Sequence, residues 1–251
     1  MSGRRSRVVA ITGGNQGIGR AVAELFLERG DRVWVCSRSP RAKDLPRAVS
    51  HVRADASRRA ELKRFVERAG NGRRGLDVLV NCAGLSLWRP LAKLDERFVS
   101  EMVESNLLTT LWGSAEAAPR LKRGGAIVNV SSLAGKRGSA NNSVYCATKF
   151  AVNGVTQALA KELGPRGIRV NAVCPVYVRT RQILRSLEEP SSPAGRQGVG
   201  PYLKSFAATQ TALGRLPTER EVAEAVYFLA GPAASAITGQ CINVDCGTLT
   251  Q

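Results

Sequence analysis

A tyrosine and a lysine one helical turn apart are the residues of this sequence best suited to proton transfer. Tyr145 and Lys149 lie in a stretch with helical periodicity, so both side chains project from the same face. A free tyrosine has a pKa of about 10 and is a poor acid or base at neutral pH, but a nearby ammonium favours the phenolate and lowers that pKa. A Tyr-x-x-x-Lys pair is common by chance, so its meaning depends on the rest of the chain.

A glycine cluster near the N-terminus is suited to binding a pyrophosphate. The run Thr12-Gly13-Gly14-Asn15-Gln16-Gly17-Ile18-Gly19 follows an apolar strand pattern and opens into a helical one. Glycines allow a tight turn and a close backbone approach, and the start of a helix offers free N–H groups to an anion. The spacing differs from the G-x-G-x-x-G fingerprint, and by itself the cluster is equally compatible with an ordinary strand–turn–helix joint.

The end of the next strand pattern bears on which dinucleotide would bind. Ser37 and Arg38 stand where the adenosine ribose would lie, and they offer a hydroxyl and a guanidinium to a 2′-phosphate. An acidic residue there would instead favour a free 2′-hydroxyl. A solvated basic turn is the alternative, because Arg41 and Lys43 follow closely. We therefore expect NADP(H) as the cofactor, with NAD(H) less favoured.

Short β-branched runs alternate with longer helical patterns along the chain. This alternation predicts an α/β fold with a single Rossmann-like, doubly wound parallel sheet of about seven strands and helices on both faces. The expected strands are Val8–Ile11, Arg32–Cys36, His51–Arg53, Leu76–Val80, Ala126–Val130, Arg169–Val173 and Cys241–Val244. The expected helices are Gly17–Arg29, Arg58–Ala69, Glu96–Ala118, Val144–Leu163 and Glu219–Leu229. A length of 251 residues fits one domain over 1–251.

The segment 176–216 interrupts this regular alternation. It is rich in proline and glycine around two short helical patterns, Arg181–Leu187 and Tyr202–Ala208. Long insertions in compact domains are usually functional, so we interpret this one as a substrate lid, with a variable surface excursion as the alternative.

Composition excludes several classes of protein. No apolar run approaches the ~20 residues of a membrane span, and the opening MSGRRSR lacks the apolar stretch of a signal peptide, so we expect a cytoplasmic protein with no membrane partner. The 6 cysteines are scattered, which favours buried reduced thiols over a disulfide framework or a metal site. His51 is the only histidine, so a Ser-His-Asp triad would have to use it.

The formal charge of +17 raises the question of nucleic-acid binding. Lysines and arginines are spread along the whole chain, from Arg4 and Arg5 to Lys136 and Arg137, and aromatic residues make up only 5%. We therefore expect a generally basic surface that favours anionic ligands, and no nucleic-acid partner.

Together these motifs resemble the short-chain dehydrogenase/reductase family from about Arg7 to Gly247. The glycine cluster is similar to the cofactor loop of that family, and Asp55 to its adenine-contacting acid. Asn81-Cys82-Ala83-Gly84 is similar to its Asn-Asn-Ala-Gly, and Pro175 to Thr180 align with its Pro-Gly-x-Val-x-Thr. The runs VWVCSR, IRVNAVCP and GPAASAITGQ look like ketoreductases of aromatic polyketide pathways.

The resemblance also implies a set of catalytic residues. Ser132 precedes Tyr145 by thirteen residues, which is the spacing in the family, and Asn106 aligns with its catalytic-helix asparagine. In family terms Tyr145 is the general acid in reduction and the general base in oxidation, and Ser132 binds the substrate oxygen. Lys149 would bind the nicotinamide ribose, lower the pKa of Tyr145 and join a water-linked proton relay with Asn106.

The implied protein is an NADP(H)-dependent oxidoreductase that moves a hydride between the nicotinamide and a carbonyl or secondary alcohol, as a homodimer or homotetramer. A catalytically idle NADP(H)-binding regulator on the same scaffold is the alternative. The expected cofactor-binding residues are Gly13, Asn15, Gln16, Gly17, Ile18, Gly19, Ser37, Arg38, Asp55, Asn81, Ala83, Gly84, Tyr145, Lys149, Pro175, Val178 and Thr180. Three residues depart from the family pattern: Cys82, Val176 and Cys246.

Overall fold

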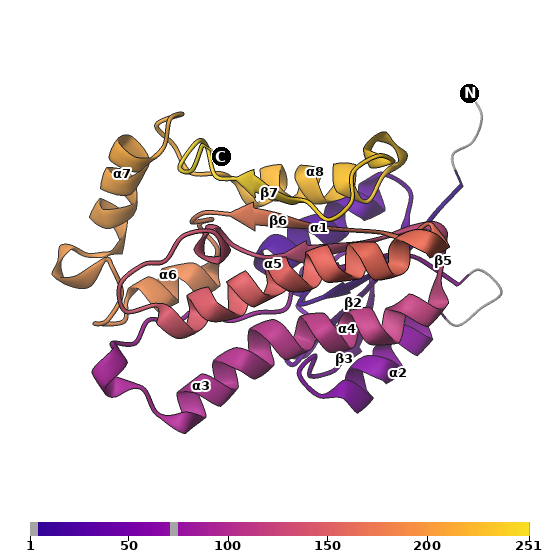
Figure 1. The fold of residues 1–251 in the computed structure, drawn as a ribbon, viewed down its shortest axis with the longest axis horizontal. Coiled ribbons are helices and arrows are strands. Elements are labelled where there is room, and N and C mark those ends of the chain that lie inside the picture. Colours follow the sequence, from indigo (N-terminus) through magenta and orange to yellow (C-terminus); the bar gives the residue numbers. More distant parts are fainter. Residues whose placement is uncertain (1–4, 71–74, 251) are drawn as a thin grey trace.

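The computed structural model describes residues 5–70 and 75–250, so Arg4 lies outside the described residues. Within them, one parallel sheet has the strand order β3-β2-β1-β4-β5-β6-β7 (Figure 1). The strands are β1 Val8–Thr12, β2 Arg32–Ser37, β3 Ser50–Arg53, β4 Leu76–Asn81, β5 Leu121–Val130, β6 Arg169–Pro175 and β7 Cys241–Val244. The predicted doubly wound sheet is confirmed, and β5 begins five residues earlier than its apolar pattern indicated.

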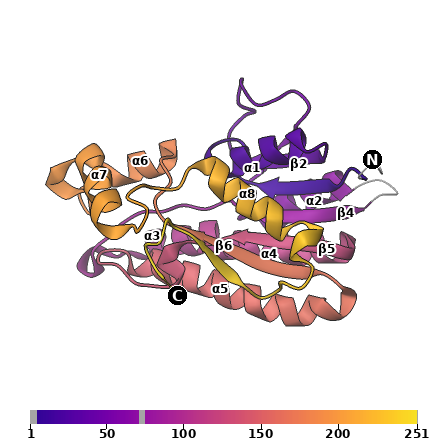
Figure 2. The ribbon, with the colours of Figure 1, turned by 90° about the horizontal axis from the view of Figure 1, so that it is seen from above.

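Helices cover both faces of the sheet, as Figure 2 shows edge-on. On one face lie α1 (Gly17–Glu28) and α8 (Glu219–Leu229), and on the other lie α2 (Arg59–Gly70), α4 (Thr109–Ala117) and α5 (Ser143–Leu163).

The strands are apolar along their whole length because each one is buried on both sides. In β1, Val9 and Ile11 pack toward α1 and α8, while the alternating Val8 and Ala10 pack toward α2.

The predicted helix Glu96–Ala118 is wrong as a single element. It consists of α3 (Glu96–Val103), a π-helical turn over Glu104–Leu108, and α4. Asn106, in the middle of the turn, donates from Nδ2 to the main-chain oxygens of Leu85 and Met102 over 2.9 and 3.0 Å. The extra residue of a π-turn is invisible in a hydrophobic pattern, because the apolar positions before and after it still repeat at helical intervals.

The segment 176–216 is more ordered than its composition indicated. It forms α6 (Arg181–Leu187), as predicted, and α7 (Val199–Gln210), which is longer than expected. Pro201 stands in the first turn of α7, where a missing N–H has little cost. Leu187 and Leu203 bury their side chains with Trp88 in a small apolar cluster. The helices α6 and α7 lie beyond the carboxyl ends of the strands (Figure 1).

All six cysteines carry free thiols. Cys246 adopts a φ of 53°, a left-handed conformation that glycine enters without strain, which explains why the family pattern has glycine there.

Among residues 5–70 and 75–250, no helix is long and apolar enough to cross a membrane.

Candidate active site

A cavity of about 630 Å³ opens at the carboxyl ends of the strands, where ligands bind in doubly wound sheets. It brings together the predicted site residues from both halves of the sheet. Those that line it are Gly13, Asn15, Gln16, Gly17, Ile18, Gly19, Ser37, Arg38, Asp55, Ala83, Gly84, Asn106, Ser132, Tyr145, Lys149, Pro175, Val178 and Thr180. Cys82 and Val176, two of the departures from the family pattern, line it as well.

Asn81 is the predicted cofactor-binding residue that does not line the cavity. Its side chain is 3% exposed, and its Nδ2 donates to Ser114 Oγ over 3.1 Å and to Asn129 Oδ1 over 2.9 Å. The side chain therefore faces α4 and β5 rather than a ligand. A strand places alternate side chains on opposite faces of the sheet, and the side chain at position 81 falls on the face covered by α4.

The candidate catalytic groups converge from β5 and α5. Ser132 follows β5, and Tyr145 and Lys149 stand one turn apart on α5. Ser132 and Ser86 line the same cavity as Tyr145, and their hydroxyls act to lower the pKa of its phenol. Lys149 Nζ lies 5.7 Å from the centre of the Tyr145 ring and donates to the main-chain oxygen of Val130 over 3.0 Å.

The protonation of this pair differs from the sequence-based expectation. Burial raises the pKa of Tyr145 to about 12, and the hydrogen bonds from Ser132 and Ser86 only partly oppose that shift. Burial lowers the pKa of Lys149 to about 8. The predicted lowering of the Tyr145 pKa by Lys149 is therefore not found, because burial disfavours the charged forms of both groups. At neutral pH the phenol is protonated and can donate.

Asn106 and Lys149 meet next to Gly84. A Cβ added to Gly84 would lie 2.8 Å from Asn106 Oδ1 and 3.6 Å from Lys149 Nζ, so only glycine leaves this corner open. Asn106 Oδ1 also accepts from the main-chain N–H of Leu85 over 3.1 Å. The amide of Asn106 thus fixes the chain after β4 against the π-turn, and its main-chain oxygen accepts from the hydroxyl of Thr110 over 3.1 Å.

The glycine loop is packed tightly against the end of β4. Gly13 has a φ of 71°, and a Cβ there would come within 2.9 Å of Ala83 Cα. Thr12 Oγ1 accepts from the N–H groups of Cys82 and Ala83, both over 3.0 Å, which holds β1 and β4 together. No side chain caps the start of α1, so its N–H groups face the cavity without a protein acceptor from the N-cap residue.

Asn15, which lines the cavity, also binds the loop after β2. Its Nδ2 donates to Ser39 Oγ and to the Pro40 oxygen over 3.0 and 2.8 Å, and its Oδ1 accepts from the Ala42 N–H over 2.8 Å. The Asn15 side chain therefore holds the loop after β2 in place beside the cavity.

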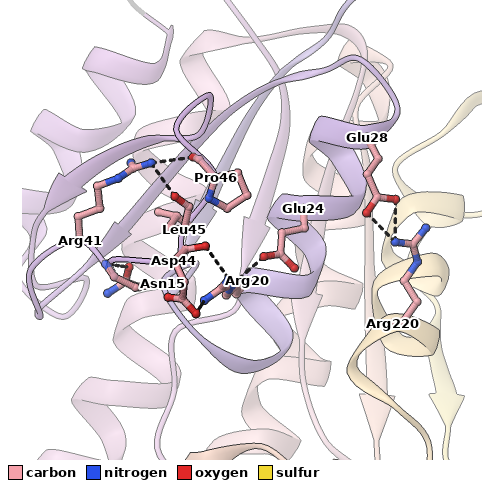
Figure 3. Close-up of polar contacts among 10 residues, drawn as sticks. Asn15, Arg20, Glu24, Glu28, Arg41, Asp44, Leu45, Pro46 and Arg220 are labelled. Carbon is pink, nitrogen blue, oxygen red and sulfur yellow. Dashed lines mark hydrogen bonds and ion pairs between the residues drawn. The ribbon is translucent and has the colours of Figure 1, made fainter.

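Figure 3 shows that two arginines hold the same loop after β2. Arg41 donates to the main-chain oxygens of Leu45 and Pro46, and Arg20 pairs with Asp44 and Glu24. These contacts fix the loop that carries the expected phosphate-binding residues before any ligand arrives.

Ser37 and Arg38 stand at the adenosine end of the cavity. Arg38 is exposed, and its guanidinium makes no hydrogen bond or ion pair with the part of the chain that the structure describes. Ser37 Oγ donates to the Ser39 oxygen over 2.9 Å and lies 2.8 Å from His51 Nε2. Partial burial and the charge of Arg41 lower the pKa of His51. His51, the only histidine in the sequence, therefore contacts Ser37 at the candidate phosphate site. It is far from Tyr145 in the sequence.

Sequence reasoning missed four residues that shape the site: Thr12, His51, Ser86 and Gln182. Gln182, on α6, donates to the Gly84 oxygen over 2.9 Å and so ties the segment 176–216 to the catalytic corner. Thr12 and Ser86 follow or end strands at the carboxyl edge, which is a usable signal. His51 and Gln182 reach the site through pairings that no local pattern reveals.

Comparisons with known proteins agree with this geometry. The family model described as enoyl-(acyl carrier protein) reductase matches residues 13–249. The 3-oxoacyl-(acyl-carrier-protein) reductase FabG of Vibrio cholerae is 33% identical over 96% of this chain and 96% of its own length. The diacetyl reductase, (S)-acetoin forming, of Staphylococcus aureus is 34% identical over 96% of this chain and 97% of its own.

Solved structures show the same likeness. ElxO with NADP bound is 29% identical, with a TM-score of 0.85 over 98% of this chain and 100% of that one. The 3-ketoacyl-(acyl-carrier-protein) reductase of Brucella melitensis complexed with NADH is also 29% identical, with a TM-score of 0.83 over 96% of this chain and 98% of that one.

A doubly wound sheet with a glycine loop and a Ser-Tyr-Lys cluster in one cavity defines a nucleotide-dependent oxidoreductase. The chain belongs to the short-chain dehydrogenase/reductase family, as the sequence analysis predicted, and is an enzyme acting on CH–OH or C=O groups.

Proposed function

We propose that the protein is an NADP(H)-dependent ketone reductase or alcohol dehydrogenase with Tyr145 as its proton-transfer residue. The observation that carries the proposal is the convergence of Ser132 and Tyr145 with Lys149 and the glycine loop in one cavity. A protonated Tyr145 can donate to the oxygen of a carbonyl that Ser132 positions. The bound nicotinamide supplies or accepts the hydride.

The chain's own residues fit a dinucleotide. The uncapped start of α1 and the tight turn at Gly13 suit a pyrophosphate, and the open corner at Gly84 lies beside Lys149. Lys149 would hold the nicotinamide ribose and, with Asn106, take part in a proton relay to Tyr145.

The unpaired guanidinium of Arg38 supports NADP(H) over NAD(H), since a 2′-phosphate would supply the anion that this group lacks. ElxO binds NADP, and the Brucella melitensis reductase was crystallised with NADH, so relatives use both cofactors. The direct test is a screen of ketones and alcohols, including diacetyl, with NADPH and NADP⁺, followed at the absorbance of the reduced nicotinamide. Failure to turn over any carbonyl or alcohol with either cofactor would refute the proposal.

Lys149 should make cofactor binding pH-dependent. Below a pKa of about 8 the ammonium is charged and can hold the ribose, and above it the amine is neutral. The Kd for NADPH should therefore rise about tenfold between pH 7 and pH 9, measured by fluorescence titration. Lys149→Ala should bind more weakly at pH 7 and lose this dependence. A flat profile in the wild type, or the same slope in the variant, would contradict the ribose contact.

The segment 176–216 is proposed to act as a substrate lid. It lines the cavity with residues such as Val176 and Ile183, yet its own apolar cluster is small and peripheral. In the free protein trypsin should cut first at the exposed Arg185 or Lys204, and NADP⁺ with an alcohol substrate should slow that cut several-fold. Cleavage at the exposed Arg64 on α2 serves as the control. Equal rates with and without ligand would indicate a fixed surface excursion.

A homodimer or homotetramer is the assembly we propose. The exposed Phe150 of α5 and an apolar groove between α3 and α5, lined by Val99, Val103 and Val144, would be covered by a second copy.

A further inference from the structure

The cavity has an aromatic wall at the end away from the adenosine site. Tyr177, which follows β6, packs edge-on against Phe206 of α7, with ring centres 4.9 Å apart at 80°. Both residues line the cavity, as do Leu133 and Trp88, which is 4% exposed. The hydroxyl of Tyr177 is bound to that of Tyr202 over 3.1 Å, so both phenols have a partner and the ring faces remain the contact surface.

This wall adjoins the catalytic corner. Burial is the main cause of the raised pKa of Tyr177, and Tyr145 is among the groups that raise it further, which places the two phenols near each other. A substrate held for proton transfer from Tyr145 would therefore rest part of its body on Tyr177 and Phe206. Aromatic rings of this kind bind flat, apolar groups.

Arg137 adds a charge to this end of the cavity. It follows Ser132 by five residues, lines the cavity, and acts electrostatically on the phenols of both Tyr177 and Tyr202, opposing the effect of burial on their pKa values. No hydrogen bond or ion pair joins its guanidinium to any residue in 5–70 or 75–250.

Nothing acidic balances that charge within the described cavity wall. Asp55 is the sole carboxylate among the described lining residues, and it follows β3 at the adenosine end. Other arginines of the chain are paired with carboxylates, such as Arg7 with Asp31 and Arg59 with Glu116. A positive group in a cleft with apolar walls concentrates anionic ligands there.

We propose that the substrate is a ketone with a flat apolar body and a carboxylate, with the body on Tyr177 and Phe206 and the carboxylate on Arg137. The guanidinium of Arg137 carries the charge opposite to that of a carboxylate and can bind both of its oxygens. The assignment rests on the proposed reductase function and adds a substrate class to it.

The reaction leaves the carboxylate unchanged. NADPH transfers a hydride to the ketone carbon and is oxidised to NADP⁺, while Tyr145 gives its proton to the ketone oxygen, so the ketone is reduced to a secondary alcohol. Solvent returns one proton to Tyr145. The role of Arg137 is confined to binding and orienting the substrate.

The test compares a series of aryl keto acids with their methyl esters. Benzoylformate, 3-benzoylpropionate and 4-benzoylbutyrate place the carboxylate at increasing distances from the ketone, and each ester keeps the body but removes the charge. The ratio of kcat/KM for acid over ester should exceed one for at least one chain length. Arg137→Ala should lower that ratio about tenfold, through KM, and added salt should lower it in the wild type. Arg137→Lys should keep part of the preference, and Arg64→Ala, which removes an exposed charge on α2, should keep all of it.

A binding measurement separates this inference from the proposed function. Calorimetry with the NADP⁺-loaded protein should show tighter binding of an acid than of its ester, lost in Arg137→Ala, even if turnover is absent. If diacetyl or another neutral ketone is reduced but no acid binds better than its ester, the carboxylate assignment is wrong and the reductase function stands. An equal loss for acid and ester in Arg137→Ala would also overturn it.

Discussion

Tyr145→Phe should lower kcat by about 10²–10⁴ while the Kd for NADPH stays near that of the wild type. The substitution removes one hydroxyl and keeps the ring that packs in the cavity. That hydroxyl is the proposed proton donor, and its pKa of about 12 means that it is protonated at neutral pH. The measurement is NADPH oxidation with a ketone from the substrate screen, together with fluorescence titration of the cofactor.

The matched control is Tyr227→Phe. Tyr227 lies on α8 and outside the cavity wall, where its ring packs edge-on against Phe26 and under the guanidinium of Arg7. The Tyr227→Phe variant should keep the wild-type kcat. More than a tenth of wild-type turnover in Tyr145→Phe would contradict the assignment of Tyr145 as the proton donor.

Removal of the Arg38 guanidinium should weaken NADPH binding about ten- to a hundredfold and leave NADH binding unchanged. The lower end applies at higher ionic strength, because Arg38 is exposed and its charge is screened by salt. The measurement is the ratio of kcat/KM for NADPH over NADH in the wild type and in Arg38→Ala. Arg47→Ala is the control, since Arg47 is exposed in the same loop and lies outside the cavity wall.

Ser37→Asp should move the preference further toward NADH. A carboxylate there would repel a 2′-phosphate and accept from a free ribose hydroxyl. Because Ser37 Oγ already donates to Ser39, its own contribution to phosphate binding should be smaller than that of Arg38. If the wild type prefers NADH, or if neither Ser37→Asp nor Arg38→Ala lowers the ratio, the turn after β2 does not bind the 2′-phosphate.

Strands and helix ends were predictable where the local pattern was unambiguous. The strand β7 and the helices α6 and α8 have the predicted bounds, since each is an apolar run or periodic segment with clear breaks at its ends. Thr218 shows the reason for α8: it caps the helix in a reciprocal pair with Glu221. The π-turn at Asn106 could not be predicted, because it depends on contacts with Leu85, distant in sequence.

Some features of the candidate site were likewise predictable from the sequence, and others depend on the tertiary structure. The sequence by itself determined the family, the glycine loop and the Ser132, Tyr145 and Lys149 spacing, because these depend on residue type and order along one strand or helix. Only the tertiary structure decided that Asn81 faces away from the cavity, that Asn15 holds a loop, and that burial raises the pKa of Tyr145. Burial and long-range pairing are properties of the packed chain, and a linear pattern of residue types does not contain them.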